Sequence, residues 1–149
     1  MSKAESKERF SFRCAVYLIL QKDNKILLMR RFNTGWKDGM YTLPAGHVDG
    51  NETIADSMTR EALEETGVLV KSEDLSVVHT VHQIGDKEYI DFYLQANKWN
   101  GDPSILEPDK CDDIQWFSLN ELPDKLLPNV KDVLKQLENG QTFSEFKWK

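Results

Sequence analysis

Three glutamates form the part of this sequence best suited to chemistry: Glu61, Glu64 and Glu65. In a helix, positions i, i+3 and i+4 share one face, so these carboxylates would lie together. At about 100° per residue, Glu61 and Glu65 lie near the side of Ile54 and Met58, which predicts partial burial. Partly buried carboxylates need protons or cations. Because Mg²⁺ prefers hard oxygen ligands and often binds few carboxylates together with phosphate oxygens, the cluster favours a magnesium site.

The same pattern also fits an ordinary acidic helix whose glutamates are supported by Arg60, with Glu52 as a further partner of that arginine. The segment before the helix favours the metal site. Gly46 and Gly50 frame a turn that would bring backbone carbonyls beside the carboxylate face. A carbonyl oxygen is a further hard ligand, so loop and helix would converge on one cation.

The elements that must position these residues alternate between strands and helices. Thr53 and Asp56 have the spacing of a capping box, and Gly67 stands where a C-cap glycine belongs, so a helix is expected over residues 53–66. A last helix is expected from an Asn129 cap to about residue 138. Together these elements indicate an α/β sandwich with a mixed sheet. Apolar and β-branched runs separated by turns predict strands over residues 11–21, 25–32, 41–43, 75–84, 88–96 and 112–117.

Length and charge narrow the function classes. A length of 149 residues fits one domain. The net charge of −6 offers no basic patch for a long nucleic acid. No apolar run reaches the roughly 18 residues of a membrane span. Cys14 and Cys111 lack a CxxC spacing, which fits a reducing compartment. We therefore expect a cytoplasmic protein with a flexible tail over residues 1–9 and a single domain over 10–149, which binds neither nucleic-acid polymers nor membranes.

Residues 46–68 resemble the Nudix box, the signature of the Nudix hydrolase superfamily. Ala62, where a bulkier aliphatic residue is often found, is the one mild departure. The resemblance implies the Nudix fold, an α/β/α sandwich with a mixed β-sheet, in a short single-domain member of the MutT-like group. The signature positions, all filled here, are Gly46, Glu52, Arg60, Glu61, Glu64, Glu65 and Gly67.

The resemblance also implies a reaction. Such enzymes hydrolyse a pyrophosphate bond in a nucleoside diphosphate linked to another moiety, with water activated by Mg²⁺ or by Mn²⁺ in its place. Glu61 would be the general base, although other relatives take that base from outside the box. Arg60 and Glu52 would orient the cluster, and Arg60 and Glu64 are counted with Glu61 in the catalytic group. Gly46 and Gly67 would be structural. The implied metal ligands are Glu61, Glu64, Glu65 and the carbonyl of Ala45.

Outside the box, the resemblance points to one more acidic ligand from the loop before the last expected strand. Asp112 is preferred, with Asp109 and Asp113 as alternatives, and a plain solvated loop would also fit. Arg31 would contact the nucleotide, since a guanidinium is well shaped for phosphate. Trp36 would stack on its base. Either side chain also fits an ordinary surface or packing role.

The expected substrate is a nucleoside or deoxynucleoside triphosphate, cleaved to monophosphate and pyrophosphate. The proline that marks many ADP-ribose hydrolases is missing, because Gln83 and Ile84 stand there. Hydrolysis of ADP-ribose or a nucleotide sugar remains an alternative, as does a Nudix domain that binds a ligand without hydrolysis. A hydrolase of ADP-ribose or of a nucleotide sugar would use the same box. A domain that only binds its ligand is disfavoured, because every box glutamate is present. A monomer and a homodimer both remain open.

Overall fold

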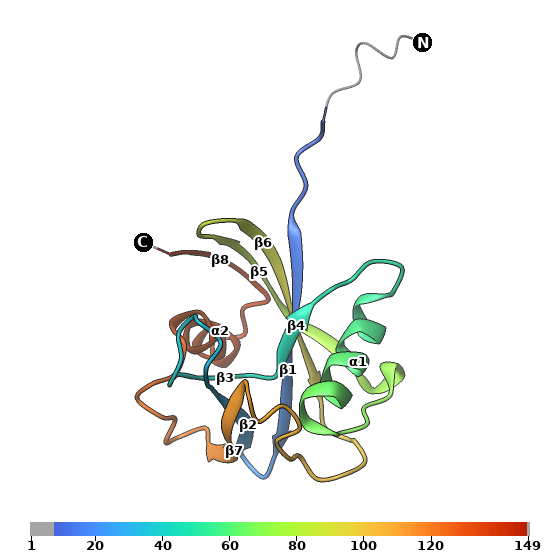
Figure 1. The fold of residues 1–149 in the computed structure, drawn as a ribbon. Coiled ribbons are helices and arrows are strands. Elements are labelled where there is room, and N and C mark those ends of the chain that lie inside the picture. Colours follow the sequence, from blue (N-terminus) through green and yellow to red (C-terminus); the bar gives the residue numbers. More distant parts are fainter. Residues whose placement is uncertain (1–7, 149) are drawn as a thin grey trace.

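The structure is a computed structural model that describes residues 8–148 (Figure 1). The expected flexible tail over residues 1–9 lies almost entirely outside the described residues. No helix within this range is long and apolar enough to span a bilayer. The helices are α1 (Ile54–Thr66) and α2 (Pro128–Glu138), with a short 3-10 turn, η1 (Ser72–Asp74). The strands are β1 (Arg13–Lys22), β2 (Lys25–Arg31), β3 (Tyr41–Thr42), β4 (Ala45–His47), β5 (Ser76–Ile84), β6 (Glu88–Ala96), β7 (Cys111–Ser118) and β8 (Phe143–Lys147).

Strand β1 is the centre of a mixed sheet. It runs parallel to β6, in a register that pairs Arg13 with Tyr89 and Leu20 with Ala96, and antiparallel to β4. Strand β2 meets β1 only at the end of their hairpin and carries β3 and β7. Beyond β6 the sheet continues through β5 and β8. The predicted α/β fold with a mixed sheet is confirmed.

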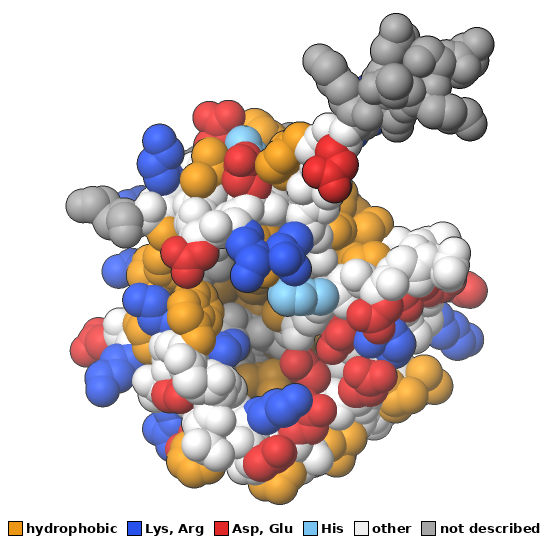
Figure 2. Space-filling view, turned by 45° about the horizontal axis from the view of Figure 1, so that its top comes forward, with side chains coloured by type: hydrophobic (Ala, Val, Ile, Leu, Met, Phe, Trp, Pro, Cys, Tyr) orange, Lys and Arg blue, Asp and Glu red, His pale blue; other side chains and the backbone are white. Residues whose placement is uncertain are grey.

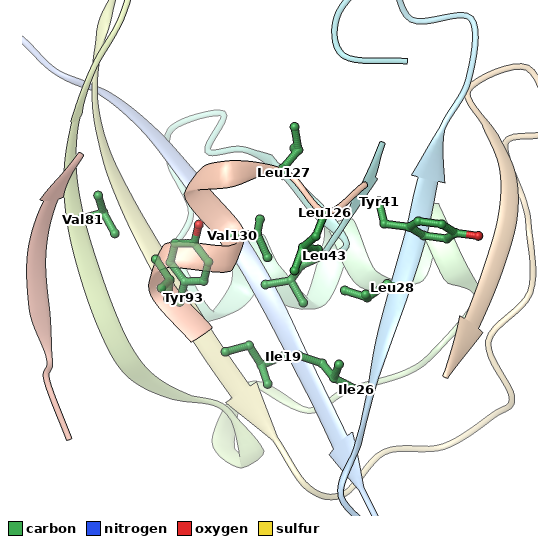
Figure 3. Close-up of a cluster of buried hydrophobic side chains, with 11 residues drawn as sticks. Ile19, Ile26, Leu28, Tyr41, Leu43, Val81, Tyr93, Leu126, Leu127 and Val130 are labelled. Carbon is green, nitrogen blue, oxygen red and sulfur yellow. The ribbon is translucent and has the colours of Figure 1, made fainter. Parts of the chain in front are cut away.

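The two helices cover opposite sides of the strands, as Figure 1 shows. Successive side chains of β1 point to opposite faces. Ile19 therefore packs in the cluster that contains Val130 of α2, and Leu18 in the cluster that contains Met58 of α1. Figure 3 shows Ile19 and Val130 beside Tyr93 of β6. Burial on both faces explains why the sequence of β1 lacks a polar side.

Both ends of α1 form as predicted. The Thr53 side chain accepts a hydrogen bond from the backbone N–H of Asp56 at 3.0 Å, which caps the first turn. Gly67 adopts a left-handed conformation with φ of 77°, and its N–H donates to the Leu63 carbonyl at 3.0 Å. Glycine takes this conformation without a steric penalty, so the helix ends directly after its last glutamates.

The start of α2 differs from the prediction that Asn129 caps it. The helix begins two residues earlier, at Pro128, whose fixed φ suits the first helical position and which has no N–H to satisfy. Leu127 occupies the capping position without a side-chain hydrogen bond. Asn129 is buried inside the first turn, where its amide nitrogen lies 3.4 Å from the Tyr17 hydroxyl.

Strands β4 and β8 were not expected. The residues of β4 are Ala45, Gly46 and His47, which read as turn formers; pairing with β1 imposes the strand. Strand β8 lies at the edge of the sheet, parallel to β5, and three of its five side chains are exposed. A short edge strand of this kind carries too few apolar residues to be distinguished from a polar loop.

Candidate functional site

The most buried carboxylate of α1 is that of Glu65. It accepts a hydrogen bond from the backbone N–H of Ala45 in β4 at 2.9 Å. Burial raises the pKa of Glu65 to about 8; the Ala45 amide opposes this rise, and the nearby charges of Glu61 and Glu107 add to it. A buried carboxylate with one hydrogen-bond donor and two acidic neighbours is a group that a cation would stabilise.

The Glu61 side chain lies against the backbone of β4. Its carboxyl group occupies the place where a Cβ on Gly46 would stand, so only glycine allows this approach. The side chain is 13% exposed, and burial raises its pKa while Arg60 lowers it. Glu64, one turn away from Arg60, is 54% exposed. The three carboxylates therefore form a graded face that runs from the interior, at Glu65, to solvent, at Glu64.

Arg60 lies at the centre of the acidic cluster. Its guanidinium nitrogens are 2.8 Å from Glu52, 3.0 Å from Glu61, and 3.4 Å from both Glu64 and Asp49. The hydrogen bonds from Arg60 lower the pKa of Glu52 to about 2, and those same bonds raise the pKa of Arg60. The predicted pair between Arg60 and Glu52 is confirmed, and it ties the loop before α1 to the helix.

Replacing Arg60 with alanine is expected to lower the melting temperature by roughly 5 °C. The change leaves the partly buried Glu52 and Glu61 without their shared cation. Arg60→Lys keeps the charge but not the forked geometry, so it should recover only part of the loss. Thermal unfolding in a chelator measures both variants. An alanine variant as stable as the original chain would contradict the central role of Arg60.

The oxygen atoms on this face of α1 and on β4 fit a divalent cation, although Arg60 forms ion pairs with Glu61 and Glu64 in this structure. Within residues 8–148, no three acidic, histidine or cysteine side chains are already gathered around one point as a metal site. All nearby donors are oxygens, as hard divalent cations require. The residues that would hold such a cation are Glu61, Glu64 and Glu65, with the Ala45 carbonyl beside them.

The acidic residues outside the box are divided between two places. Asp112, the preferred candidate, pairs with Arg30 at 2.7 Å. Asp113 accepts hydrogen bonds from Tyr41 of β3 and Gln115 of β7. Asp109 and Glu107 instead line a hollow together with Glu65. Glu107 is not among the residues predicted for the site, although its position at the head of the acidic loop is a usable signal. A ligand role for Asp112 stays a prediction.

A cleft of about 740 Å³ opens beside the carboxylate face. Its lining includes Ala45 and Gly46, which also contact Glu65 and Glu61. Figure 2 shows a hollow in the surface with basic side chains above it and acidic ones to its lower right. A volume of this size is within the range of small-molecule sites. A ligand bound in the cleft would thus lie next to the glutamates.

The two residues predicted to contact substrate, Arg31 and Trp36, lie in this cleft. The Nε of Arg31 donates to the Trp36 carbonyl at 2.7 Å, and its guanidinium is 5.0 Å from the centre of the Trp36 ring. Trp36 is 47% exposed and meets Trp148 edge to face, with ring centres 5.7 Å apart. Both rings are available as walls of the cleft, while contact with a nucleotide stays a prediction.

The floor of the cleft contains a buried acid, Asp91, that sequence analysis missed. It is 1% exposed and accepts a hydrogen bond from Gln83, which in turn accepts one from the indole N–H of Trp148. Burial raises the pKa of Asp91 to about 7, and the bond from Gln83 opposes the rise. Its place in an apolar strand gave no signal beyond one acidic residue among aromatic neighbours.

This environment gives Asp91 a predicted effect on stability. An acid whose pKa is higher in the folded chain than in the unfolded chain, where it is about 4, makes stability fall as the pH rises from about 4 to about 7. Asp91→Asn should remove that contribution, so at about pH 8 the variant should unfold at a higher temperature than the original chain. Its free energy of unfolding should be greater by at most about 4 kcal/mol. The difference should narrow steadily towards about pH 4. Thermal unfolding of both chains across this pH range measures the difference in their stability. A difference that does not change with pH would contradict the prediction.

Comparisons with known proteins agree with this architecture. The sequence profile of the NUDIX domain matches residues 11–137. An ADP-ribose pyrophosphatase of Methanocaldococcus jannaschii is 34% identical over 122 residues, which are 81% of this chain and 70% of that protein. The NAD-capped RNA hydrolase NudC of Vibrio parahaemolyticus is 31% identical over 116 residues, but this match spans only 40% of that longer protein.

A solved structure shows the same fold. The crystal structure of a MutT NUDIX hydrolase from Burkholderia pseudomallei superimposes with a TM-score of 0.79 at 26% identity, covering 86% of this chain and 99% of that one. The profile match includes α1 with its glutamates and the strands beside it. The chain therefore belongs to the NUDIX family and is a Nudix pyrophosphohydrolase.

Proposed function

We propose that this enzyme hydrolyses a nucleoside or deoxynucleoside triphosphate to the monophosphate and pyrophosphate, with Mg²⁺ as its cation. One observation carries the proposal. Strand β4 separates the cleft from the glutamates by a single layer of backbone: Ala45 and Gly46 line the cleft on one side and contact Glu65 and Glu61 on the other. A polyphosphate at that end of the cleft would be next to the residues that contact Glu61 and Glu65.

The chain's own residues divide the work. Glu61, Glu64, Glu65 and the Ala45 carbonyl would hold the cation, which supplies charge neutralisation and a water of lowered pKa. Water adds to a phosphorus of the pyrophosphate bridge, the bond from that phosphorus to the bridging oxygen breaks, and pyrophosphate leaves. Glu61, whose carboxyl group lies against Gly46 of β4, is our choice to take the proton from this water. Arg60 positions Glu61 and Glu64 through its two ion pairs.

Basic side chains in the cleft support a polyanionic substrate. Lys37 and Lys87 line it together with Arg31, and they come from three separate segments of the chain. Ammonium groups bind phosphate as point charges, without needing a fixed orientation. Arg31 is already committed to Trp36 and Thr34, so it also holds the shape of the loop that carries Trp36.

ADP-ribose is the second candidate substrate. The relative from Methanocaldococcus jannaschii is named for this activity. Because ADP-ribose also contains a pyrophosphate bridge and a nucleoside, the same cleft and carboxylates would serve either compound. The two candidates differ in the leaving group: pyrophosphate from a triphosphate, and ribose 5-phosphate from ADP-ribose.

A substrate panel tests the proposal. Purified protein is incubated with Mg²⁺ and with each common nucleoside and deoxynucleoside triphosphate, ADP-ribose and a nucleotide sugar, and the products are separated by ion-exchange chromatography. We expect pyrophosphate and monophosphate from at least one triphosphate, and no turnover after chelation of the metal. Faster turnover of ADP-ribose than of every triphosphate would replace the first candidate with the second. No turnover with Mg²⁺ or Mn²⁺ would refute hydrolysis of these compounds.

A further inference from the structure

We propose that Asp91 reads the base of the bound nucleotide, by accepting a hydrogen bond from an N–H group on the edge of that base. This inference rests on the proposed function, because it places a nucleotide in the same cleft. It adds a specificity-determining residue that lies outside the Nudix box, on β6. The supporting observations concern the position of Asp91, the orientation of its carboxyl group and an unused acceptor atom.

Asp91 lies at the right separation from the phosphate end of the cleft. Ala15 of β1 pairs with His47 of β4 on one side and with Asp91 of β6 on the other. Two strand spacings separate His47 from Asp91, or roughly 10 Å between backbones. That is comparable with the reach of a nucleoside from its phosphate to the far edge of its base. Phosphates beside Gly46 would therefore place a base over Asp91.

The walls of this end of the cleft are aromatic. Trp36 and Trp148 meet there, and Tyr89 lies on the same strand as Asp91 and lines the cleft with them. Aromatic faces stack with any nucleobase, since every base offers a π-face. The Asp91 carboxylate, charged above its pKa of about 7, would repel phosphate, and the metal-binding carboxylates lie beside β4, so we assign the phosphates to the β4 end of the cleft and the base to this end.

The carboxyl group of Asp91 has a fixed orientation. The indole nitrogen of Trp148 is a donor only, so the atom of Gln83 that faces it must be the carbonyl oxygen. The amide nitrogen of Gln83 then faces Asp91 and donates to Oδ2. This series of hydrogen bonds, from Trp148 through Gln83 to Asp91, occupies Oδ2 and leaves Oδ1 for another partner.

Within residues 8–148, Oδ1 of Asp91 has no hydrogen-bond partner, although the side chain is buried. Buried polar atoms almost always have a partner, because an unpaired one is costly. Asp91 belongs to the lining of the cleft, so a ligand can supply the missing donor. Base edges carry N–H groups as amino or ring donors, and a carboxylate oxygen accepts from either.

The substitution Asp91→Asn gives a directional test. Because Trp148 fixes the orientation of Gln83, the new carboxamide must turn its oxygen towards the Gln83 donor. Its NH₂ group would then take the place of the free Oδ1, so an acceptor becomes a donor while the shape is kept. Asp23→Asn, in the exposed turn between β1 and β2, is the control for the loss of one negative charge.

The experiment compares two substrates that differ by one donor. For the triphosphate that turns over fastest, the partner is the analogue without the base amino group, such as inosine for guanosine, or with the ring N–H methylated. The original chain should prefer the natural base by roughly 10- to 100-fold in kcat/KM. Asp91→Asn should reduce that preference at least severalfold, while Asp23→Asn keeps it.

Trp148→Phe provides a second variant that leaves Asp91 in place. It retains an aromatic wall but removes the N–H that orients Gln83, so it should lower the preference less than Asp91→Asn does. Preferences unchanged in both variants, in an enzyme that still turns over, would overturn the role of Asp91 and leave the proposed function intact. If no nucleotide is hydrolysed, the proposed function fails first. Titration of the tryptophan fluorescence with the same two nucleotides then tests recognition of the base without turnover. If the ratio of their two affinities is the same in both variants as in the original chain, the role of Asp91 is overturned.

Discussion

Glu65→Gln is expected to lower kcat by about 1,000-fold or more, the scale seen when a key electrostatic or metal-binding group is lost. Glutamine keeps an acceptor for the Ala45 N–H but removes the charge that would hold a cation. The same change should raise the melting temperature of the metal-free protein. Because the pKa of this buried carboxyl group is about 8, folding at neutral pH requires it to take up a proton, and glutamine removes that cost.

Opposite changes in activity and stability distinguish a ligand from a structural residue. Thermal unfolding in a chelator and again with saturating Mg²⁺ measures the stabilisation that the metal adds, which should shrink in Glu65→Gln. Glu121→Gln, in an exposed loop, is the control for the loss of one carboxylate. A Glu65→Gln variant that is unstable and retains most of its activity would show that this carboxylate supports the fold rather than the chemistry.

Gly46→Ala is expected to lower kcat/KM by roughly 100-fold, as small misplacements of catalytic groups do. The added Cβ would overlap the Glu61 carboxyl group, so this side chain or β4 must move. Gly46 is not among the residues with positive φ, so alanine brings no backbone strain of its own. The whole effect should therefore come from displacement of Glu61 and not from loss of the turn.

A double-mutant cycle isolates that contact. In a Glu61→Ala background the obstructing carboxyl group is gone, so adding Gly46→Ala should change the melting temperature little. In the original background the same substitution should lower it by several degrees. Equal losses in the two backgrounds would mean that the methyl group disturbs β4 directly, and that the close approach of Glu61 is not what requires glycine.

The sequence predicts the features of this molecule that depend on short stretches of chain. The ends of α1 follow from Thr53 and Gly67, and the Arg60–Glu52 pair follows from the spacing within the box. These signals are local, so they do not depend on distant pairing. The α/β class follows in the same way from the periodicity of the strands and the helix.

The features that the sequence does not predict depend on segments far apart in the chain. Asp91 reads as one polar residue in an apolar strand, and only the register of β1, β5 and β6 places it on the floor of the cleft. Trp148 reaches the same place because β8 pairs with β5. The choice among Asp109, Asp112 and Asp113 depends on which way each side chain of the loop and β7 turns, and periodicity does not determine this for an irregular segment.

The parallel pairing of β1 with β6 has a consequence for how the chain is made. Strand β1 leaves the ribosome before its principal partner, β6, which follows only after the hairpin, the box and α1. Until then, a strongly apolar segment that is buried on both faces in the finished sheet remains uncovered. Such segments associate with other chains when they wait for a distant partner. A chaperone that holds β1 until β6 has been made should therefore increase the soluble yield of the enzyme.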